Sequence, residues 1–423
     1  MKGAALLLLA VLPASTLAEP SASRFAGTWR ATITLPGGEL PFTLRVDEKS
    51  GVLSAAAING EEEKRFDVVR TEGTSLLLRF EVYDSEIQAD LSPDGAKLTG
   101  EWTKPVGVRL PFAAVRGDPR RFLPGADLGR RDAPSVGGAW LVVFKNKSDD
   151  ETARGEFTQL GERVRGTFLT PTGDHRFLEG DFREGVLRLS GFDGGHAFLY
   201  SARRQPDGTL VGEFWSGAGT TPTPWTGRPV PLGGTDGLPD EFAEAGLANG
   251  EGRLRFSFPD LDGHAVSLGD PRFAGRVVVV NVFGTWCPNC NDEAPLLGQW
   301  YRRYRDRGFE IVGLAYEATG DRETDTRSVR TFAHHYGVEY TLLLAGIRDR
   351  AAALKTLPDV TGLLAFPTTI FVGRDGRVRR IHSGYAGPGT GAHHAKLVAE
   401  LDSLLEGLLA EPAPKTEAAA GRP

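Results

Sequence analysis

The stretch FGTWCPNCNDEAP (residues 283–295) contains both cysteines of the 423-residue chain, Cys287 and Cys290. A disulfide between them would close a four-residue ring, which constrains too little of the unfolded chain to be kept mainly for stability. The spacing instead indicates redox chemistry, in which one thiol attacks a disulfide and the second resolves the mixed disulfide. A zinc site would need two further ligands and no other cysteine exists, so no metal is expected.

A thiolate is the attacking species in such exchange, and a free cysteine has a pKa of about 8.5. The helical pattern begins at Cys290 and ends at Gly308, and a helix N-terminus lowers the pKa of a thiol placed there. We therefore expect an accessible thiolate at Cys287, with the resolving thiol one turn deeper. Pro288 suits the first helical turn, because its fixed φ is already helical and its missing N–H is not needed there. Asn289 is expected on the surface of the spacer.

The sequence around this stretch alternates strands and helices. The run VVVVNVF (residues 277–283) is continuous and β-branched, which is typical of a buried central strand. Further strands are expected at residues 257–267 around Asp262-Gly263, at 309–317 and at 340–346, helices at 326–337 and 391–409, and a hairpin at 367–384 turned at Asp375-Gly376. This pattern predicts an α/β domain over residues 251–410.

The order of these elements, with WCxxC at the first strand-to-helix junction, resembles a thioredoxin-like fold. The closer resemblance is to the TlpA/ResA family of exported thiol-disulfide oxidoreductases, over residues 254–409. It is carried by VVNVFGTWCPNC, an acidic residue three positions after the second cysteine, Pro295, the FPTT motif and the DG hairpin. The resemblance implies a redox-active disulfide between Cys287 and Cys290 and no bound cofactor.

The resemblance also assigns roles to single residues. It implies that Pro367 is a cis-proline facing the dithiol, and that the backbone of Phe366, Pro367 and Thr368 pairs with an extended client segment. Thioredoxins keep an Asp in the strand before the site, where Asn281 stands here and cannot titrate. In the TlpA/ResA family a Glu three residues after the second cysteine replaces it, so Glu293 is expected to be the general base for the resolving thiol, with a pKa raised by burial.

Two neighbours of the motif complete the expected site. Trp286 is expected to shield the dithiol and shape the docking surface, and Asp292 to face outward. The implied partners are a disulfide-containing client protein and a membrane thiol that donates electrons, and cytochrome c maturation is one use of the family. Reduction of client disulfides is the expected direction, although an Asn at the third motif position does not fix it.

The N-terminus and the charge bound the location and the partners. Residues 1–18 carry one Lys, an apolar run and small residues at Thr16 and Ala18, which predicts a signal peptide cleaved after Ala18. The mature chain is expected to be soluble, and periplasmic or secreted, where disulfides persist. The formal net charge of -6 is spread without long blocks, which argues against a nucleic-acid partner.

The middle of the chain predicts two all-β units, residues 19–122 and 134–230, each a small barrel or part of a sandwich. Their sequences match at offsets of 111 or 112, as in FAGTWRATI against VGGAWLVVF, Arg65-Phe66 against Arg176-Phe177, and LTGEW against LVGEF. The pairs Asp94-Gly95 and Asp207-Gly208 predict hairpins with primed turns. Five tryptophans are core residues or line a ligand cavity: Trp29, Trp102, Trp140, Trp215 and Trp225. A linker is expected at residues 231–250 and a disordered tail at 411–423, and the ligand of the β units is unknown.

Two other functions stay open. Peroxiredoxin-type thiol peroxidases share the fold, but they place Thr three residues before the reactive Cys, whereas Gly284 holds that position here and Thr285 follows it. The second alternative is a binding protein whose β units grip a ligand, with an accessory redox domain.

Overall fold

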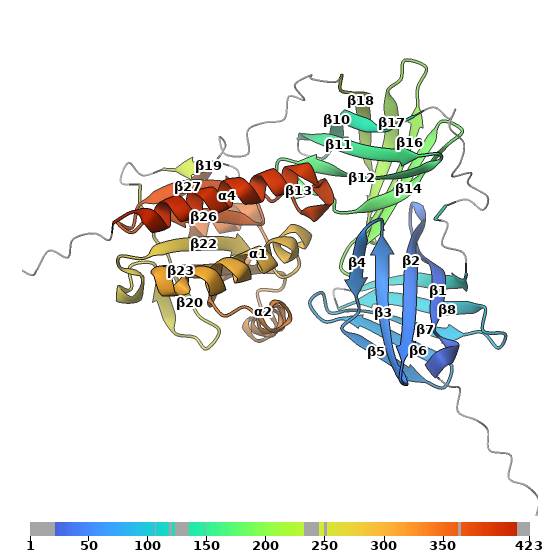
Figure 1. Cartoon of the computed structure of the whole chain (residues 1–423), viewed down its shortest axis with the longest axis horizontal. Coiled ribbons are helices and arrows are strands. Elements are labelled where there is room, and N and C mark those ends of the chain that lie inside the picture. Colours follow the sequence, from blue (N-terminus) through green and yellow to red (C-terminus); the bar gives the residue numbers. More distant parts are fainter. Residues whose placement is uncertain are drawn as a thin grey trace, which may run out of the picture.

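A computed structural model describes residues 22–105, 107–117, 121–122, 135–147, 149–231, 245–248, 252–362 and 365–412. Two β units lie on one side of the molecule and an α/β domain lies on the other (Figure 1). The expected signal peptide and residues 413–423 of the expected tail fall outside the described residues. Within the described residues, every helix is too short or too polar to cross a membrane.

The first β unit is an antiparallel sheet in the order β4-β3-β2-β1-β9-β8-β7-β6-β5. Its strands are β1 (Gly27–Leu35), β2 (Gly38–Lys49), β3 (Val52–Asn59), β4 (Glu62–Arg65), β5 (Val68–Glu72), β6 (Ser75–Phe80), β7 (Ser85–Leu91), β8 (Lys97–Lys104) and β9 (Val108–Arg116), after the short helix η1 (Ala22–Arg24). Apolar and polar residues alternate along β7, so one face of the sheet is buried. Among the described strands no ladder joins β4 to β5, so this sheet stays open.

The second β unit closes on itself. Its order is β11-β10-β18-β17-β16-β15-β14-β12-β13, and a further pairing of β11 with β12 makes a barrel. Its strands are β10 (Gly138–Lys145), β11 (Asp150–Leu160), β12 (Arg163–Thr170), β13 (Gly173–Asp174), β14 (Leu178–Arg183), β15 (Val186–Phe192), β16 (Ala197–Arg204), β17 (Leu210–Ser216) and β18 (Thr223–Pro229). The prediction left a small barrel and part of a sandwich open. The described strands of the second unit form a barrel, and those of the first form a half-open barrel.

The two β units have equivalent tryptophan contacts, and they share part of one core. The indole of Trp29 donates to the Phe25 carbonyl at 3.0 Å, and that of Trp140 donates to the Val136 carbonyl at 2.8 Å. Phe192 of the barrel packs into the core of the open sheet, which covers part of its apolar face. Four of the five tryptophans are buried in these cores, and Trp215 is half-buried. The four buried tryptophans therefore pack in the cores.

The predicted hairpins at Asp94-Gly95 and Asp207-Gly208 form, but the predicted primed turns are wrong. In each turn the glycine N–H donates to the carbonyl three residues earlier, on Ser92 or Gln205, and the glycine has a positive φ of 70° or 87°. Both aspartates keep a negative φ, whereas a type I′ turn needs positive φ at two successive residues. The Pro before each Asp favours the ordinary turn, because it fixes φ near −65°.

The α/β domain has a five-stranded mixed sheet in the order β24-β23-β22-β26-β27. Its larger elements are β22 (Val277–Phe283), α1 (Pro288–Tyr304), β23 (Phe309–Glu317), α2 (Arg322–Tyr336), β24 (Thr341–Ile347), α3 (Arg350–Thr356), β26 (Thr368–Val372), β27 (Val378–Ser383) and α4 (Ala392–Ala410). The predicted strand at residues 277–283 is central and wholly buried. This order confirms the expected thioredoxin-like fold.

Smaller elements complete the domain. They are β20 (Ser257–Pro259), β21 (Ala265–Ser267), η2 (Pro271–Phe273), η3 (Arg305–Arg307), η4 (Pro388–Thr390), β19 (Ala245–Leu247) and β25 (Val360–Gly362). Strand β19 lies in the expected linker and pairs with β25, so the end of that segment belongs to the sheet structure of the domain. Helix α3 and strand β25 carry too few periodic residues to be predicted.

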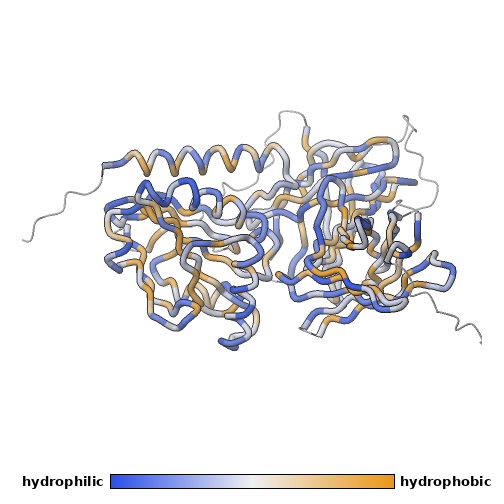
Figure 2. The backbone as a smooth tube through the Cα atoms, turned by 60° about the horizontal axis from the view of Figure 1, so that its bottom comes forward, coloured by the Kyte–Doolittle hydropathy of each residue, from blue (hydrophilic) through white to orange (hydrophobic). Residues whose placement is uncertain are grey.

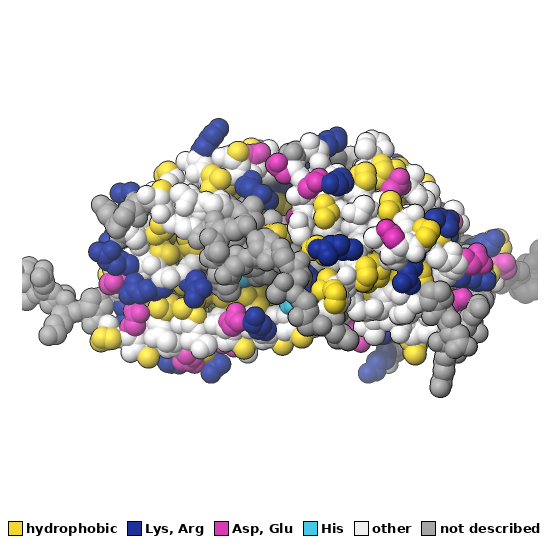
Figure 3. Space-filling model, turned by 90° about the horizontal axis from the view of Figure 1, so that it is seen from above, with side chains coloured by type: hydrophobic (Ala, Val, Ile, Leu, Met, Phe, Trp, Pro, Cys, Tyr) yellow, Lys and Arg dark blue, Asp and Glu magenta, His cyan; other side chains and the backbone are white. Residues whose placement is uncertain are grey.

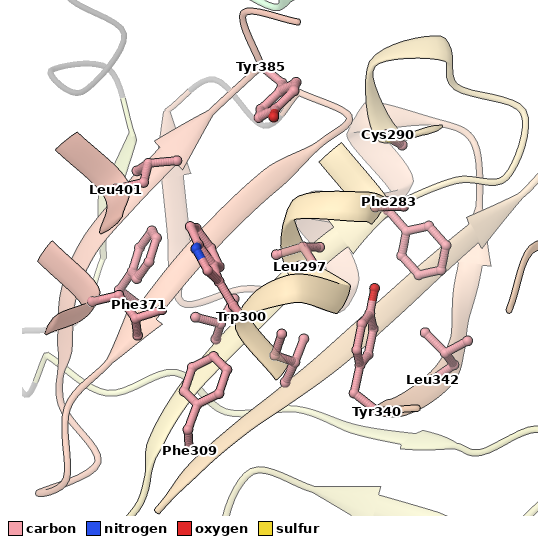
Figure 4. Close-up of a cluster of buried hydrophobic side chains, with 14 of the residues drawn as sticks. Phe283, Cys290, Leu297, Trp300, Phe309, Tyr340, Leu342, Phe371, Tyr385 and Leu401 are labelled. Atoms are coloured by element: carbon pink, nitrogen blue, oxygen red, sulfur yellow. The ribbon is translucent and has the colours of Figure 1, made fainter. Parts of the chain in front are cut away.

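Two helices and a layer of aromatic side chains form the core beside the site. Orange and blue segments alternate along α4 in Figure 2, because its leucines face the sheet and its polar residues face solvent. In Figure 4 Cys290 lies at one end of this core, near Phe283 and away from Phe309.

On the surface, basic and acidic side chains are interspersed over the face seen in Figure 3.

Candidate redox site

The dithiol lies where β22 leads into α1. Cys287 is the N-cap of the helix, with extended φ and ψ of −87° and 124°, and its Sγ accepts a hydrogen bond from the Cys290 N–H at 3.4 Å. The helix starts at Pro288, two residues before the predicted start, because proline is favoured in the first turn.

Both cysteines are buried, which corrects the expectation of an accessible thiolate at Cys287. The residue exposures are 3% for Cys287 and 2% for Cys290. Burial raises the pKa of the Cys290 thiol well above its usual range, and the adjacent Cys287 sulfur raises it further. The second thiol therefore needs a proton acceptor before it can react.

The peptide bond between Phe366 and Pro367 is cis, as expected. Cys287 donates from its Sγ to the Phe366 carbonyl at 3.2 Å, which places the sulfur beside this peptide. The ring of Trp286 packs edge-on against Phe366, with centroids 5.4 Å apart, and its indole N–H donates to the Tyr316 carbonyl. The Phe366 carbonyl thus contacts the sulfur directly, and the Trp286 ring packs behind Phe366.

Thr368 does not face the dithiol with its side chain. Its hydroxyl donates to the Ala365 carbonyl at 2.8 Å and lies 3.2 Å from the Ser383 hydroxyl. Thr368 is fully buried, so only its backbone could take part in binding an extended client.

Glu293 is buried below the dithiol with two hydrogen-bond donors. One carboxylate oxygen accepts from the Asn281 amide at 2.8 Å, and the other accepts from the Thr369 hydroxyl at 2.6 Å. Burial raises the pKa of Glu293 to about 7, although both hydrogen bonds act to lower it. The predicted rise in pKa is confirmed. A carboxyl that titrates near neutral pH can accept the proton of a buried thiol.

Asn291 fixes the turn that carries Cys287. Its amide donates to the carbonyls of Thr285 and Cys287 at 2.9 and 2.7 Å, and its own carbonyl accepts from the Tyr336 hydroxyl at 2.9 Å. All hydrogen-bonding atoms of this buried side chain point at the turn or at α2. An Asn next to the second cysteine is the one local signal for this role, and it does not distinguish a structural Asn from an exposed one.

Asn289 is buried, so the expectation that it lies on the surface is wrong. Its amide donates to both the backbone carbonyl and the carboxylate of Asp174 in β13, at 3.3 and 3.1 Å. The Asp174 carboxylate also accepts from the backbone N–H of Gly387 and of Arg176. Burial, together with the nearby charge of Asp292, raises the pKa of Asp174 to about 7.

Asp292 faces the second β unit, so the expectation that it faces outward is also wrong. Its carboxylate forms an ion pair with Arg176, whose guanidinium donates to the Pro288 carbonyl at 3.1 Å as well. The same guanidinium pairs with Glu62 of the first β unit and lies 3.5 Å from Asp193 of the second. Burial alone would lower the pKa of Arg176, but these three carboxylates hold it well above its usual value.

Arg176 therefore joins all three parts of the chain at the first turn of α1. Figure 1 shows β4, β13 and the start of α1 side by side at this point. The matching Arg65 of the first unit is exposed instead. Sequence reasoning noted the Arg-Phe match but could not tell which arginine is buried, because the difference depends on contacts between distant segments.

A cavity of about 370 Å³ lies beside the motif, between the first β unit and the α/β domain. Its lining includes Tyr83, Lys104, Thr285, Trp286 and Arg348. Glu317 also borders it and accepts from the backbone N–H and the hydroxyl of Thr285; burial raises the pKa of Glu317 to about 7. Within the described residues, no group of three or more His, Cys, Asp or Glu side chains is placed to hold a metal ion.

Comparison with known families places the redox site within a recognised group. Residues 250–381 match the family model described as the AhpC/TSA family. The thiol-disulfide oxidoreductase ResA of Halalkalibacterium halodurans is 29% identical over 144 residues, which are 34% of this chain and 73% of that protein. ResA of Geobacillus kaustophilus is 31% identical over 30% of this chain and 66% of its own length, and ResA of Bacillus subtilis is 27% identical over 33% and 69%. The chain spans 62% of ResA from Bacillus thuringiensis subsp. konkukian.

Solved structures overlap the same part of the chain. A thiol:disulfide interchange protein of the thioredoxin family from Chlorobium tepidum TLS shares 23% identity and covers 37% of this chain and 94% of its own, with a TM-score of 0.28. A secreted disulfide oxidoreductase of Mycobacterium tuberculosis shares 22% identity over 34% of this chain and 95% of its own, with a TM-score of 0.26. The family match, the ResA relatives and the fold around the dithiol support a TlpA/ResA-like thioredoxin-fold domain at residues 250–381, and this part of the chain is an oxidoreductase.

Proposed function

We propose that this chain is an exported thiol-disulfide oxidoreductase that reduces client disulfides through the dithiol of Cys287 and Cys290. One observation carries the proposal: the Cys287 sulfur caps α1 and touches both the Cys290 N–H and the Phe366 carbonyl next to the cis peptide. This geometry supports a nucleophile with its resolving partner one helical turn behind it. The names of the ResA relatives support the same reaction.

The residues support a two-step exchange. In the first step the Cys287 thiolate attacks one sulfur of a client disulfide, and the other client sulfur leaves as a thiolate. In the second step Cys290 transfers its proton to Glu293 and attacks the Cys287 sulfur, which releases the reduced client and leaves the Cys287–Cys290 disulfide. A thiol donor at the membrane then reduces this disulfide, so two electrons pass from the donor to the client.

Trp286, Phe366 and the backbone of Pro367 and Thr368 are proposed to contact the client. The contacts of Trp286 and Phe366 with each other and with the Cys287 region support this role. For Thr368 only the backbone is proposed, since its hydroxyl is used inside the protein.

The wider setting is also a proposal. We place a signal peptide at residues 1–18 and the mature chain in the periplasm or outside the cell, with cytochrome c maturation as one process it could serve. We divide the chain into β units at 19–122 and 134–230, related by duplication, a connecting segment at 231–250, a redox domain at 251–410 and a tail at 411–423. The equivalent indole contacts of Trp29 and Trp140 support the duplication.

The test is reduction of insulin by the purified full chain with dithiothreitol as the donor. We expect the wild type to accelerate insulin precipitation, Cys287→Ser to abolish the acceleration, and Cys290→Ala to accumulate a mixed disulfide with insulin. If the wild type fails to accelerate the reaction while Cys287→Ser removes only peroxide consumption, the peroxidase alternative replaces this function. Trapping with Cys290→Ala in cells would identify the physiological client.

A further inference from the structure

The β units cover the face of the α/β domain that carries the dithiol. Cys287 is 3% exposed, and it shares one buried cluster with Leu169 of the second β unit and Val82 of the first. Thiol-disulfide exchange requires the attacking sulfur to reach a sulfur of the other molecule. As arranged here, the Cys287 sulfur cannot meet a disulfide in another protein.

The second β unit contacts the motif through the turn at residues 171–174, which follows β12 and includes the two residues of β13. On one side Asn289 donates two hydrogen bonds to Asp174, and on the other the Gly387 N–H donates to the Asp174 carboxylate at 2.5 Å. A Cβ on Gly384 would lie 3.0 Å from the Pro171 carbonyl oxygen. The turn is thus held between the spacer of the two cysteines and the loop that follows β27.

The site occupied by residues 171–174 borders the cis peptide between Phe366 and Pro367. The Gly384 N–H donates to the Pro367 carbonyl at 2.8 Å, and the preceding carbonyl, of Phe366, accepts from Cys287. Glycines of the loop after β27 face residues of the second β unit. A Cβ on Gly387 or Gly389 would lie only 2.7 or 2.8 Å from atoms of that unit. The loop that follows β27 therefore approaches the second β unit more closely than a residue with a Cβ would allow.

We propose that residues 171–174 occupy the groove through which a client reaches Cys287, so that the client is a disulfide on an extended, flexible segment that displaces this turn. The inference rests on the proposed function and adds the class of client to it. A disulfide inside a compact domain does not enter, because residues 171–174 are in direct contact with Asn289 on one side and with the Gly384 and Gly387 loop on the other.

The contacts that hold the β units in place are of a reversible kind. They include the Arg176–Asp292 pair, His393 with Glu156 at 3.0 Å, and His335 with Asp67 at 3.0 Å. Polar interfaces between domains of one chain resemble those of transient complexes, so relative motion is expected. Displacement of the turn is therefore compatible with a folded chain.

The first experiment measures access to Cys287 in the full chain with Cys290→Ala, so that only one thiol remains. The probe is a maleimide attached to polyethylene glycol. Gly173→Ala should weaken docking, because Gly173 has a φ of +146° and a Cβ there would lie 2.5 Å from the side-chain oxygen Oδ1 of Asn289. We expect its labelling to be at least about tenfold faster than that of the parent, the factor produced by a loss of about 1.4 kcal/mol of docking free energy.

Two matched controls come from the same barrel. Gly185→Ala also places a side chain at a positive φ, of +74°, but nothing lies within 4 Å of its Cβ. As a second pair, Asp174→Ala is compared with Asp181→Ala, since Asp181 is an equally buried aspartate far from the motif in sequence, on β14. We expect both controls to label at the parent rate and Asp174→Ala to label like Gly173→Ala.

The second experiment tests the class of client. The probe is an unstructured peptide whose one cysteine carries a thionitrobenzoate group; attack by Cys287 forms the peptide–Cys287 disulfide and releases coloured thionitrobenzoate. The comparison places the same cysteine and group within a compact folded protein. We expect the peptide to react at least about tenfold faster with the parent chain, and Gly173→Ala to speed the reaction of both probes.

The proposal is overturned if the parent chain takes up the maleimide as fast folded as it does in urea, or if both Gly173→Ala and Asp174→Ala keep the parent rate with an unchanged circular dichroism spectrum. Equal reaction of the peptide and the folded carrier with the parent chain overturns the client class. None of these readouts needs turnover. A wild type that fails to reduce a disulfide in an unstructured peptide, together with tenfold faster labelling of Gly173→Ala, would instead count against the proposed function and leave the docked turn in place.

Discussion

The Thr369 hydroxyl donates a 2.6 Å hydrogen bond to Glu293, while the hydroxyl of the adjacent Thr368 points to the Ala365 carbonyl. Successive residues of a strand face opposite sides of a sheet, so the FPTT motif sends one threonine to the carboxyl and the other away from it. This pair gives a control that differs by a single position in sequence.

The first prediction concerns the hydroxyl of Thr369. Thr369→Val removes a donor that stabilises the ionised form of Glu293, so the pKa of Glu293 should rise above its value of about 7 by about one to two units. The midpoint of the pH profile for resolution of the mixed disulfide should shift by the same amount. Thr368→Val removes a hydroxyl of equal burial and should leave the midpoint unchanged. Equal shifts in both variants would contradict the assignment of Glu293.

The second prediction concerns the carboxyl itself. Glu293→Gln removes the proton acceptor for Cys290, so resolution at pH 8 should slow by about a hundredfold, the lower range for loss of a general base. Formation of the mixed disulfide at Cys287 should change by less than about threefold, because that step does not use the carboxyl. Rapid-mixing kinetics with a chromogenic disulfide separate the two steps. Comparable slowing of both would argue against a base acting on Cys290 alone.

The third prediction follows from the same raised pKa. The folded protein keeps the Glu293 proton up to about pH 7, whereas the unfolded chain releases it near its ordinary pKa of 4.5. Stability should therefore fall as the pH rises through this window, by about 3 kcal/mol in total from this group. Glu293→Gln should remove that part of the fall, which urea unfolding at pH 5 and pH 8 would measure. A variant that loses as much stability as the wild type over this range would contradict the prediction.

The fourth prediction concerns Arg176. Arg176→Met leaves the buried carboxylates of Glu62, Asp193 and Asp292 without their shared cation, so the free energy of unfolding should drop by about 3 to 5 kcal/mol. Arg165→Met is the control, because Arg165 is half-exposed and lies 3.8 and 3.9 Å from its acidic partners; its effect should stay within about 1 kcal/mol. Urea midpoints followed by tryptophan fluorescence provide the comparison. Equal midpoints for the two variants would show that the Arg176 contacts contribute little.

The fifth prediction concerns the turn before the helix. Tyr336→Phe removes one hydrogen bond to Asn291 and should destabilise the chain by about 1 kcal/mol with little loss of activity. Asn291→Ala removes the donors to the Thr285 and Cys287 carbonyls as well. It should therefore also lower insulin reduction, because the position of Cys287 is no longer fixed. If Asn291→Ala is as active as Tyr336→Phe, the turn does not depend on this side chain.

Much of the α/β domain could be predicted because its signals are local. The β-branched run at residues 277–283, the cysteine spacing and the Pro-initiated hairpin each lie within one short segment, and each forms as expected. The place of Glu293 also follows from local geometry, since it lies one helical turn from Cys290 and so shares its buried face.

The contacts between the β units and the dithiol could not be predicted. Asn289 and Asp292 have the polar side chains of an exposed first turn, and their burial depends on Asp174 and Arg176, more than a hundred residues earlier in the chain. The glycine-rich segment at residues 384–391 was the available signal, since closely spaced glycines often mark close backbone approach. That signal indicates a tight contact but not its partner.

The buried guanidinium of Arg176 makes the chemical state of the thiols depend on the integrity of segments that carry no redox group. Arg176 neutralises carboxylates from all three parts of the chain. Loosening either β unit therefore weakens the contacts that hold Arg176 against Asp292 at the start of α1. Heat, proteolysis or a destabilising substitution in a barrel would then expose Cys287 to oxidants before the redox domain itself melts. Damage to the non-catalytic half would thus first register as a change in sulfur chemistry.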